Sequence, residues 1–264
     1  MRIVNTIAAA ALVASLPAAA QAAQVAALWG DNTISIVDTD AKKVTKTWKV
    51  SGVSGRVVGI DVRPADGMLY GLVADGTVVT IDLATGKATM KSKLETMLPA
   101  GTMATVDFNP LADRLRVIGS DGSNLRANVD DGKVIKDGML KYAGGDANKG
   151  KMPKVVAGAY SNSFKGTKAT TLYDIDAANG TFVRQVPPND GVLNSIGKLA
   201  AGGNASRDSW AFDIWSDGRG GNEAWLLAGG MLHKVDLATG KTTAAGKIDG
   251  VRGEVRDIAI LPAM

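Results

Sequence analysis

Apolar and polar residues alternate along this chain in short runs that end at glycine-containing turns. The clearest run is TVVTIDLATGKATMKS, residues 77–92, in which Val79 and Ile81 alternate with polar residues and Thr85-Gly86 follow. A period of two predicts a half-buried strand, and a glycine that can adopt positive φ suits a tight turn. The segment therefore predicts a β-hairpin.

The same pattern returns as MLHKVDLATGKTTAAG, which indicates an internal repeat. A second type of segment, a strand with a central Asp that often stops at Pro, occurs at residues 57–64, 103–110, 154–162, 209–216 and 254–262, with Ala159 replacing the Asp in the third copy. Each of the first four copies is followed by three further strand patterns joined by tight turns. Four consecutive strands of this kind predict a β-meander.

The two ends of the chain complement each other. Residues 24–50 supply a second, third and fourth strand without a first one, and residues 254–262 supply a first strand with nothing after it. Together they make one complete unit. We therefore predict an all-β fold, a β-propeller of five four-stranded blades, in which the C-terminal strand completes the N-terminal blade and closes the ring. A two-layered β-sandwich has a similar strand content but leaves the divided unit unexplained.

The first 22 residues have the pattern of a secretory signal peptide. Arg2 gives the positive start, residues 7–16 are apolar, and Ala20-Gln21-Ala22 fits the small-x-small cleavage pattern. We expect a signal peptide at 1–22 and a single propeller domain at 23–264, exported to the periplasm or the medium. No later run is long enough to span a bilayer, and the absence of cysteine argues against a lipid anchor.

Composition excludes several classes of function. The 30 Lys and Arg and 26 Asp and Glu residues give a net charge of +4 and are dispersed, so we expect no nucleic-acid partner. Because the chain has no cysteine, it has neither disulfides nor thiolate metal sites. His233 is its one histidine, so a Ser-His-Asp triad or a histidine metal site would depend on it alone. We expect an exported monomer.

Several strings along the chain are distinctive: GIDVRPADGMLYGL, VDFNPLADRLRVIGSDGSNLRAN, TTLYDID, PPNDGVLNSIGKL and VDLATGK. In these strings the chain resembles the bacterial secreted family known as domain of unknown function 4394, over about residues 28–261. The most specific part covers residues 113–116 and 124–126. The resemblance implies a propeller-like exported protein and brings no established reaction.

The aspartates of the repeated first strand are the first candidate site. Since the first strand of a blade lies nearest the axis, Asp61, Asp107, Asp213 and Asp257 are expected to form a ring around the central channel. Such carboxylates can ligate a hard cation such as Ca²⁺, the candidate cofactor. Alternatively, two of them perform acid–base chemistry on a sugar, or each one binds backbone N–H groups of the neighbouring blade.

Two further groups depart from the repeat. The first is a set of polar residues around the second and third strands of one unit: Asn109, Asp113, Arg114, Arg116, Asn124 and Arg126. It predicts either a buried ion-pair network or a pocket for an anion. The second is residues 186–197, where Asn189 and Asp190 either line a site at the rim or simply form a turn.

These features favour a non-enzymatic binding or scaffold module whose partner is a small molecule, a glycan or a protein. A propeller fold by itself argues for no particular function. The alternatives are a carbohydrate-active hydrolase that uses axial carboxylates and a calcium-stabilised structural propeller.

Overall fold

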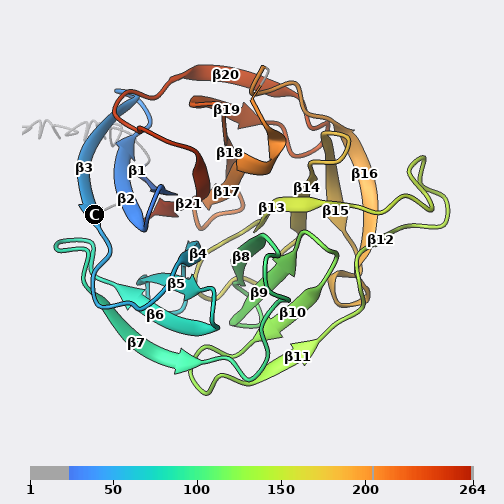
Figure 1. Cartoon of the computed structure of the whole chain (residues 1–264). Helices are drawn as coiled ribbons and strands as arrows, with labels where there is room; N and C mark the ends of the chain where they lie inside the picture. Colours follow the sequence, from blue (N-terminus) through green and yellow to red (C-terminus); the bar gives the residue numbers. More distant parts are fainter. Residues whose placement is uncertain (1–23, 204, 263–264) are drawn as a thin grey trace, which may run out of the picture.

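Five sheets arranged in a closed ring make up the computed structural model, which describes residues 24–203 and 205–262 (Figure 1). The predicted all-β propeller with five blades is therefore confirmed. The predicted signal peptide, residues 1–22, lies outside the described residues. No helix in the described part of the chain has the length and hydropathy that a membrane span requires.

Each of the first three blades has four antiparallel strands, which run from the axis to the rim. Blade 1 contains β21 (Val255–Leu261), β1 (Gln24–Trp29), β2 (Thr33–Asp38) and β3 (Lys43–Lys49). Blade 2 contains β4 (Val57–Val62), β5 (Leu69–Val73), β6 (Thr77–Ile81) and β7 (Ala88–Lys93). Blade 3 contains β8 (Ala104–Asn109), β9 (Arg114–Gly119), β10 (Asn124–Ala127) and β11 (Val134–Lys136).

The last two blades carry small additions to the same plan. Blade 4 contains β13 (Val155–Tyr160), β14 (Leu172–Asp176), β15 (Thr181–Gln185), β16 (Val192–Lys198) and a short fifth strand, β12 (Lys141–Tyr142), which pairs parallel with β16. Blade 5 contains β17 (Ala211–Ser216), β18 (Asn222–Ala228), β19 (Met231–Val235) and β20 (Thr242–Lys247). Two single-turn 3₁₀ helices are η1 (Pro188–Asp190) and η2 (Arg207–Ser209).

The ring closes through strands from the two ends of the described chain. β1 lies between β2 and β21, and its register with β21 runs from Gln24 opposite Leu261 to Trp29 opposite Val255. The predicted completion of the N-terminal blade by the C-terminal strand is therefore confirmed. Closure by hydrogen bonds removes the open strand edge that an unclosed ring would present to other chains.

Burial decreases from the axis to the rim. All six residues of β13, an innermost strand, are buried, whereas β3, an outermost strand with the sequence KVTKTWK, has no buried residue. The continuous apolar runs and the charged alternating runs of the sequence thus end up at opposite edges of each blade.

The hydrophobic core is divided into five clusters, one between each pair of neighbouring blades. Between blades 2 and 3, Tyr70 packs edge-to-face on Phe108 with ring centroids 5.2 Å apart. Between blades 4 and 5, Phe182 meets Phe212 in the same way at 5.6 Å. Each blade therefore contributes to two cores, because both faces of its sheet are covered.

The repeated DLATGK segment is a turn between the third and fourth strands of blades 2 and 5. In blade 2 the Oδ1 atom of Asp82 accepts hydrogen bonds from the backbone N–H groups of Ala84 and Thr85, and Gly86 has a φ of 72°. Glycine is needed for space as well, because a Cβ on Gly86 would lie 1.8 Å from Cδ1 of Trp48. The repetition thus reflects the scaffold.

Candidate functional site

The four repeated aspartates all lie on innermost strands, as the sequence predicts. Asp61 is on β4, Asp107 on β8, Asp213 on β17 and Asp257 on β21. Each is about 95 % buried, with 5 to 6 % of its surface exposed. The innermost strand of blade 4 has Ala159 at the equivalent position, so one side of the axis carries no carboxyl group.

Each aspartate links its own blade to another innermost strand through a backbone hydrogen bond. Asp257 accepts from the N–H of Ile60 at 2.9 Å and Asp61 from that of Phe108 at 2.6 Å. The other two bonds have the same form: Asp107 accepts from Tyr160 N–H at 2.9 Å and Asp213 from Ile260 N–H at 2.6 Å. These bonds satisfy buried N–H groups of innermost strands, which is the structural role considered from the sequence.

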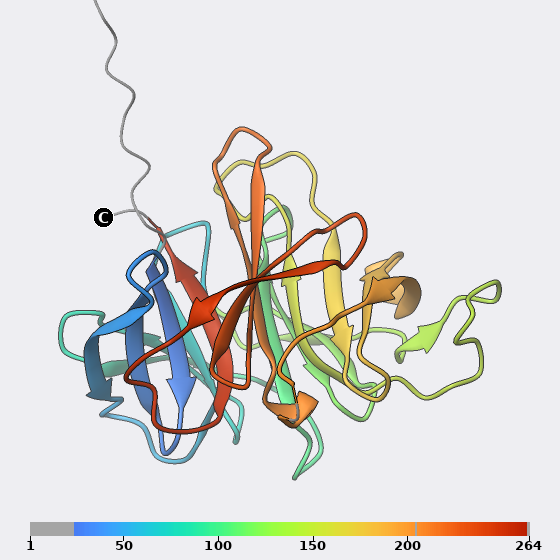
Figure 2. The ribbon, with the colours of Figure 1, turned by 90° about the horizontal axis from the view of Figure 1, so that it is seen from above.

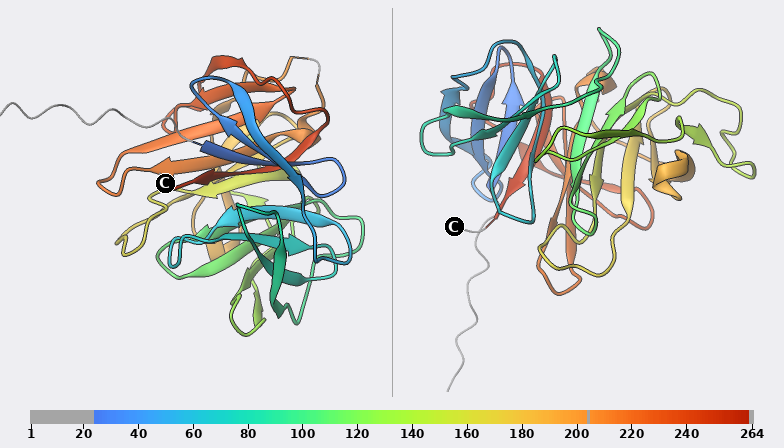
Figure 3. Two further views of the ribbon diagram at one scale, coloured as in Figure 1. Left: turned by 90° about the vertical axis from the view of Figure 1, so that its left-hand side faces the viewer. Right: turned by 90° about the horizontal axis from the view of Figure 1, so that it is seen from below.

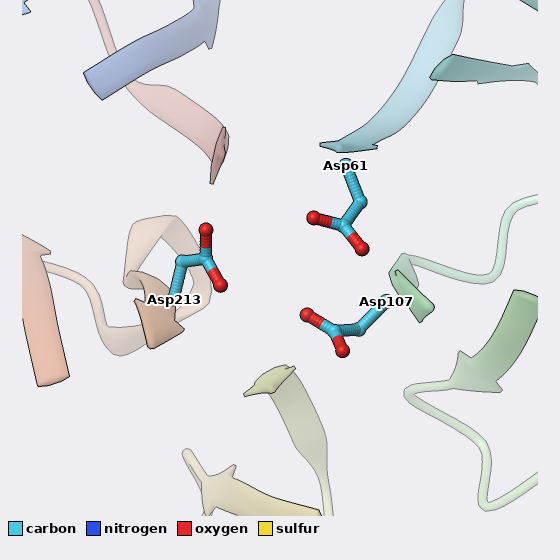
Figure 4. A group of neighbouring side chains, drawn as sticks. All are labelled: Asp61, Asp107 and Asp213. Carbon is cyan, nitrogen blue, oxygen red and sulfur yellow. The ribbon is translucent and has the colours of Figure 1, made fainter. Parts of the chain in front are cut away.

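Three of the four carboxyl groups also converge on one point. Asp61, Asp107 and Asp213 each offer one carboxylate oxygen, and these three atoms lie within 4.8 Å of one another. Figure 4 shows the side chains pointing from three blades toward a shared centre. Among the described residues, Asp257 is not part of this group of ligand atoms. The three converging aspartates are called the axial triad below.

Burial and mutual repulsion disfavour the charged form of these acids. Burial raises the pKa of Asp61 and of Asp107 well above the ordinary value, and neighbouring axial carboxylates raise it further. Burial raises the pKa of Asp213 to about 6 and that of Asp257 well above 3.8, while backbone N–H groups act in the opposite direction. No ion pair joins an axial aspartate to a Lys or Arg side chain in the described part of the chain.

A cavity of about 360 Å³ lies at one end of the axis and reaches two of the three triad residues. Its floor includes Asp61 and Asp213, and its walls include Phe164, Lys165 and Trp215. It is called the mouth cavity below. Its position follows from the topology, because the loops after the innermost strands all emerge at this end of the ring.

One wall of the mouth cavity is built from two long loops that are bound to each other. The loops after β13 and β17 project together beyond the rest of this face (Figure 2, Figure 3). Asn222 accepts from the N–H of Asn162 at 2.7 Å and donates through Nδ2 to Asn162 Oδ1 at 2.9 Å. Ser216 Oγ accepts from the N–H of Ser163 at 2.8 Å. These bonds fix the wall before any ligand arrives.

The arginine-rich group of the sequence separates into two parts. Arg116 is 2 % exposed, and its guanidinium donates to Asp137 at 2.5 Å, Asn124 at 2.8 Å and Asn189 at 2.9 Å. Arg126 donates to both oxygens of the same Asp137, at 2.6 and 2.9 Å. Four predicted site residues are thus brought together around an acid that the sequence analysis did not select.

Arg114 and Asp190 lie apart from this network, and Asn109 touches only its edge. Asn109 Oδ1 accepts from two backbone N–H groups of its own turn, and Arg114 donates to the backbone oxygens of Ala112 and Asp113. Asp190 is an exposed residue of η1. Arg114 and Asp190 thus satisfy a local turn or face solvent, whereas the Asn109 side chain also hydrogen-bonds Tyr160, whose hydroxyl accepts from Arg116 Nε at 3.1 Å.

Sequence reasoning missed Arg63, a buried arginine at the end of β4. It is 7 % exposed and donates to Asp113 at 2.6 and 2.8 Å and to Asp130 at 2.8 and 3.2 Å. This guanidinium lowers the pKa of Asp130, with Lys91 adding to the effect. A charged residue directly after the apolar strand VVGIDV was the available signal. Arg63 ties blade 2 to blade 3 as Arg116 ties blade 3 to blade 4.

Comparison with solved structures agrees with the propeller fold. A protein of unknown function from Bacteroides thetaiotaomicron VPI-5482 is 17 % identical with a TM-score of 0.54, over 92 % of this chain and 65 % of that chain. A protein of unknown function from Bacteroides caccae is 11 % identical with a TM-score of 0.48, over 92 % of this chain and all of that chain. The likeness to the Bacteroides thetaiotaomicron protein shows the fold alone, and this chain spans just under two thirds of that protein's length. No curated protein matches the chain.

The family comparison covers nearly all of the described chain. Residues 33–259 match the family model described as Domain of unknown function (DUF4394), which includes the axial triad, the mouth cavity loops and the Arg116 network. The match agrees with the resemblance carried by residues 113–116 and 124–126. The chain belongs to the DUF4394 family.

Proposed function

We propose that this protein is an exported, non-enzymatic, monomeric binding module that takes its ligand in the mouth cavity. The observation that carries the proposal is the composition of that cavity. It combines the aromatic side chains of Phe164 and Trp215 with the ammonium group of Lys165 and the acids of its floor. Ligand sites of proteins are typically concave, largely apolar and equipped with a few polar groups that orient the ligand.

The size of the cavity limits the ligand. At about 360 Å³ it lies at the lower end of the range of about 300 to 1,000 Å³ that small-molecule sites occupy. A monosaccharide, an amino acid or one side chain of a larger partner fits this volume. The two loops tied by Asn162 and Asn222 favour a preformed site, which lowers the entropic cost of binding.

The hydrogen bonds of the axial acids argue against the hydrolase alternative. A glycosidase needs a carboxylic acid that donates its proton to the leaving group. Asp61 and Asp213, the two axial acids that border the cavity, accept backbone N–H bonds with both oxygens. Burial raises the pKa of both acids, but these backbone bonds oppose that shift because they suit the ionised carboxylate. The geometry therefore supports binding better than general acid catalysis.

The test is a thermal-shift screen of the purified protein against sugars, amino acids and short peptides. Because a ligand that binds only the folded state must raise the melting temperature, at least one class is expected to raise it. Phe164→Ala should abolish the shift. Lys168→Ala is the matched control for Lys165→Ala, since both lysines are exposed on one loop and only Lys165 lines the cavity.

The control variant Lys168→Ala should bind ligand like the parent protein, whereas Lys165→Ala should bind an anionic ligand more weakly. If no compound raises the melting temperature, or if the shift persists in Phe164→Ala, the mouth cavity is not the ligand site.

A further inference from the structure

We propose that Asp61, Asp107 and Asp213 hold a hard divalent cation, of the Ca²⁺ type, on the propeller axis beneath the mouth cavity. The inference rests on the proposed function for its route of access, since the ion would enter through the same cavity that takes the ligand. It goes further by assigning the floor of the cavity a cofactor.

The first argument is the spacing of the ligand atoms. Ca²⁺ binds carboxylate oxygens at about 2.3 to 2.6 Å, so two oxygens on one ion lie no more than about 5 Å apart. One oxygen from each residue of the axial triad meets this condition, because all three lie within 4.8 Å of one another. The three ligands come from blades 2, 3 and 5, so a single ion would join three blades.

The second argument is one buried polar atom that lacks a partner, Thr105 Oγ1, and one oxygen of the triad, Asp107 Oδ2, that accepts no hydrogen bond within the described residues. The Oδ1 atom of Asp107 accepts from Tyr160 N–H, but its Oδ2 atom accepts no hydrogen bond within the described residues, although Asp107 is only 5 % exposed. Thr105 lies two residues earlier on β8, on the same face of the strand, and its buried Oγ1 atom also has no partner in the described chain. Buried polar atoms normally have partners. A cation would satisfy Asp107 Oδ2, and a water molecule bound to that cation would reach toward Thr105.

The third argument is a conflict that a cation would resolve. Asp61 and Asp213 each accept two backbone N–H bonds, which suit the ionised carboxylate. The three buried carboxyl groups converge on one point, however, so their ionised forms would repel one another. No Lys or Arg side chain pairs with the triad in the described chain, so a bound cation is the missing positive charge.

The ion would keep coordination positions open toward the mouth cavity. Ca²⁺ takes six to eight oxygen ligands, and the triad supplies three. Because Asp61 and Asp213 also line the cavity, the remaining positions face it and are available to water or to oxygen atoms of a ligand. The cation would then act as the polar anchor of the binding site.

The experiment is calcium titration of the EDTA-treated full-length protein, by calorimetry and by thermal shift, with magnesium for comparison. Saturating calcium, at about 100 times Kd, is expected to raise the melting temperature by about 5 °C or more. Asp107→Asn keeps the Oδ1 acceptor and loses the charge, and it should weaken calcium binding by at least about tenfold. Asp213→Asn is the second test variant, used if Asp107→Asn fails to fold.

Asp257→Asn is the matched control. Asp257 is an equally buried inner-strand acid with the same type of backbone bonds, but it is not part of the triad. This variant should retain the calcium-induced shift. An unchanged melting temperature and no heat of binding in the parent protein would overturn the inference, as would equal calcium affinity in Asp107→Asn.

The two proposals can fail separately. If organic ligands still bind in EDTA and calcium has no effect, the cation site is wrong and the binding function stands. If calcium binds and Asp107→Asn weakens that binding, but no ligand-induced rise in melting temperature depends on Phe164, the cation site stands and the mouth cavity is not a ligand site.

Discussion

Asp174 of β14 is a buried carboxyl group without a hydrogen-bond partner. Its exposure is 0 %, and neither of its oxygens accepts a hydrogen bond in the described part of the chain. Gly158 on the adjacent β13 makes room for it, since a Cβ there would lie 2.2 Å from Asp174 Oδ1. Burial raises the pKa of Asp174 to about 8, although the charge of Arg116 opposes the shift. The folded protein therefore holds a proton here at neutral pH.

The free-energy cost of burying this carboxyl group follows from the shift in its pKa. From 3.8 to about 8 is about four pKa units, each worth about 1.4 kcal/mol. Because the folded state binds this proton more tightly than the unfolded state, the contribution of Asp174 to stability is most favourable below pH 3.8 and becomes less favourable until about pH 8. The total loss is about 6 kcal/mol, of which about 4 kcal/mol has occurred by pH 7.

Asp174→Asn removes the titration and keeps the shape of the side chain. We expect its free energy of unfolding to exceed that of the parent protein by up to about 4 kcal/mol at pH 7 and to equal it near pH 4. The assay is urea unfolding in EDTA at several pH values between about 5 and 8, where the difference should grow by about 1.4 kcal/mol per pH unit.

Asp176→Asn is the matched control for this experiment. Asp176 lies two residues further along β14 and is equally buried, but it accepts hydrogen bonds from Tyr142 Oη–H and from the N–H groups of Lys154 and Ala178. The control variant should be destabilised. If Asp174→Asn instead loses stability at pH 7, and its curve runs parallel to that of the parent protein across the pH range, the reasoning about Asp174 is refuted.

Three further predictions concern the scaffold and use urea unfolding or size-exclusion chromatography. Arg116→Ala should cost about 3 to 5 kcal/mol, because it leaves the buried Asp137 short of a partner; a loss below about 1 kcal/mol would contradict the network. Gly86→Ala should destabilise more than Gly67→Ala, because both glycines have positive φ but only a Cβ at Gly86 meets Trp48; equal losses would show that the contact is unimportant. Removing β21 should expose the inner edge of β1 and cause aggregation, and a stable monomer on the column would show that closure is dispensable.

The strands, the turns and the number of blades could be predicted from the sequence because their causes are local. Val79 and Ile81 have the period of a strand, and Asp82 and Gly86 supply the side chain and the φ that the next turn needs. The parallel addition of β12 to blade 4 was not predictable in this way, since two residues carry too little periodicity to indicate a strand.

The candidate site could be predicted only in part. The repeat position placed four aspartates on the axis, but the sequence did not separate Asp257 from the three acids that converge. Nor did it indicate that Asp113 pairs with Arg63, fifty positions earlier in the chain, or that Arg116 pairs with Asp137. These contacts cross blade interfaces, where the partner depends on the tilt and twist of neighbouring sheets.

The sequence by itself thus determined the blade, its repetition and its closure, since hydrophobic period and turn chemistry act within one unit and the divided unit leaves a ring as the consistent arrangement. The tertiary structure alone decided the triad, the mouth cavity and the arginine networks. Each of these joins side chains from separate blades, and their distances follow from how five sheets pack around a common axis.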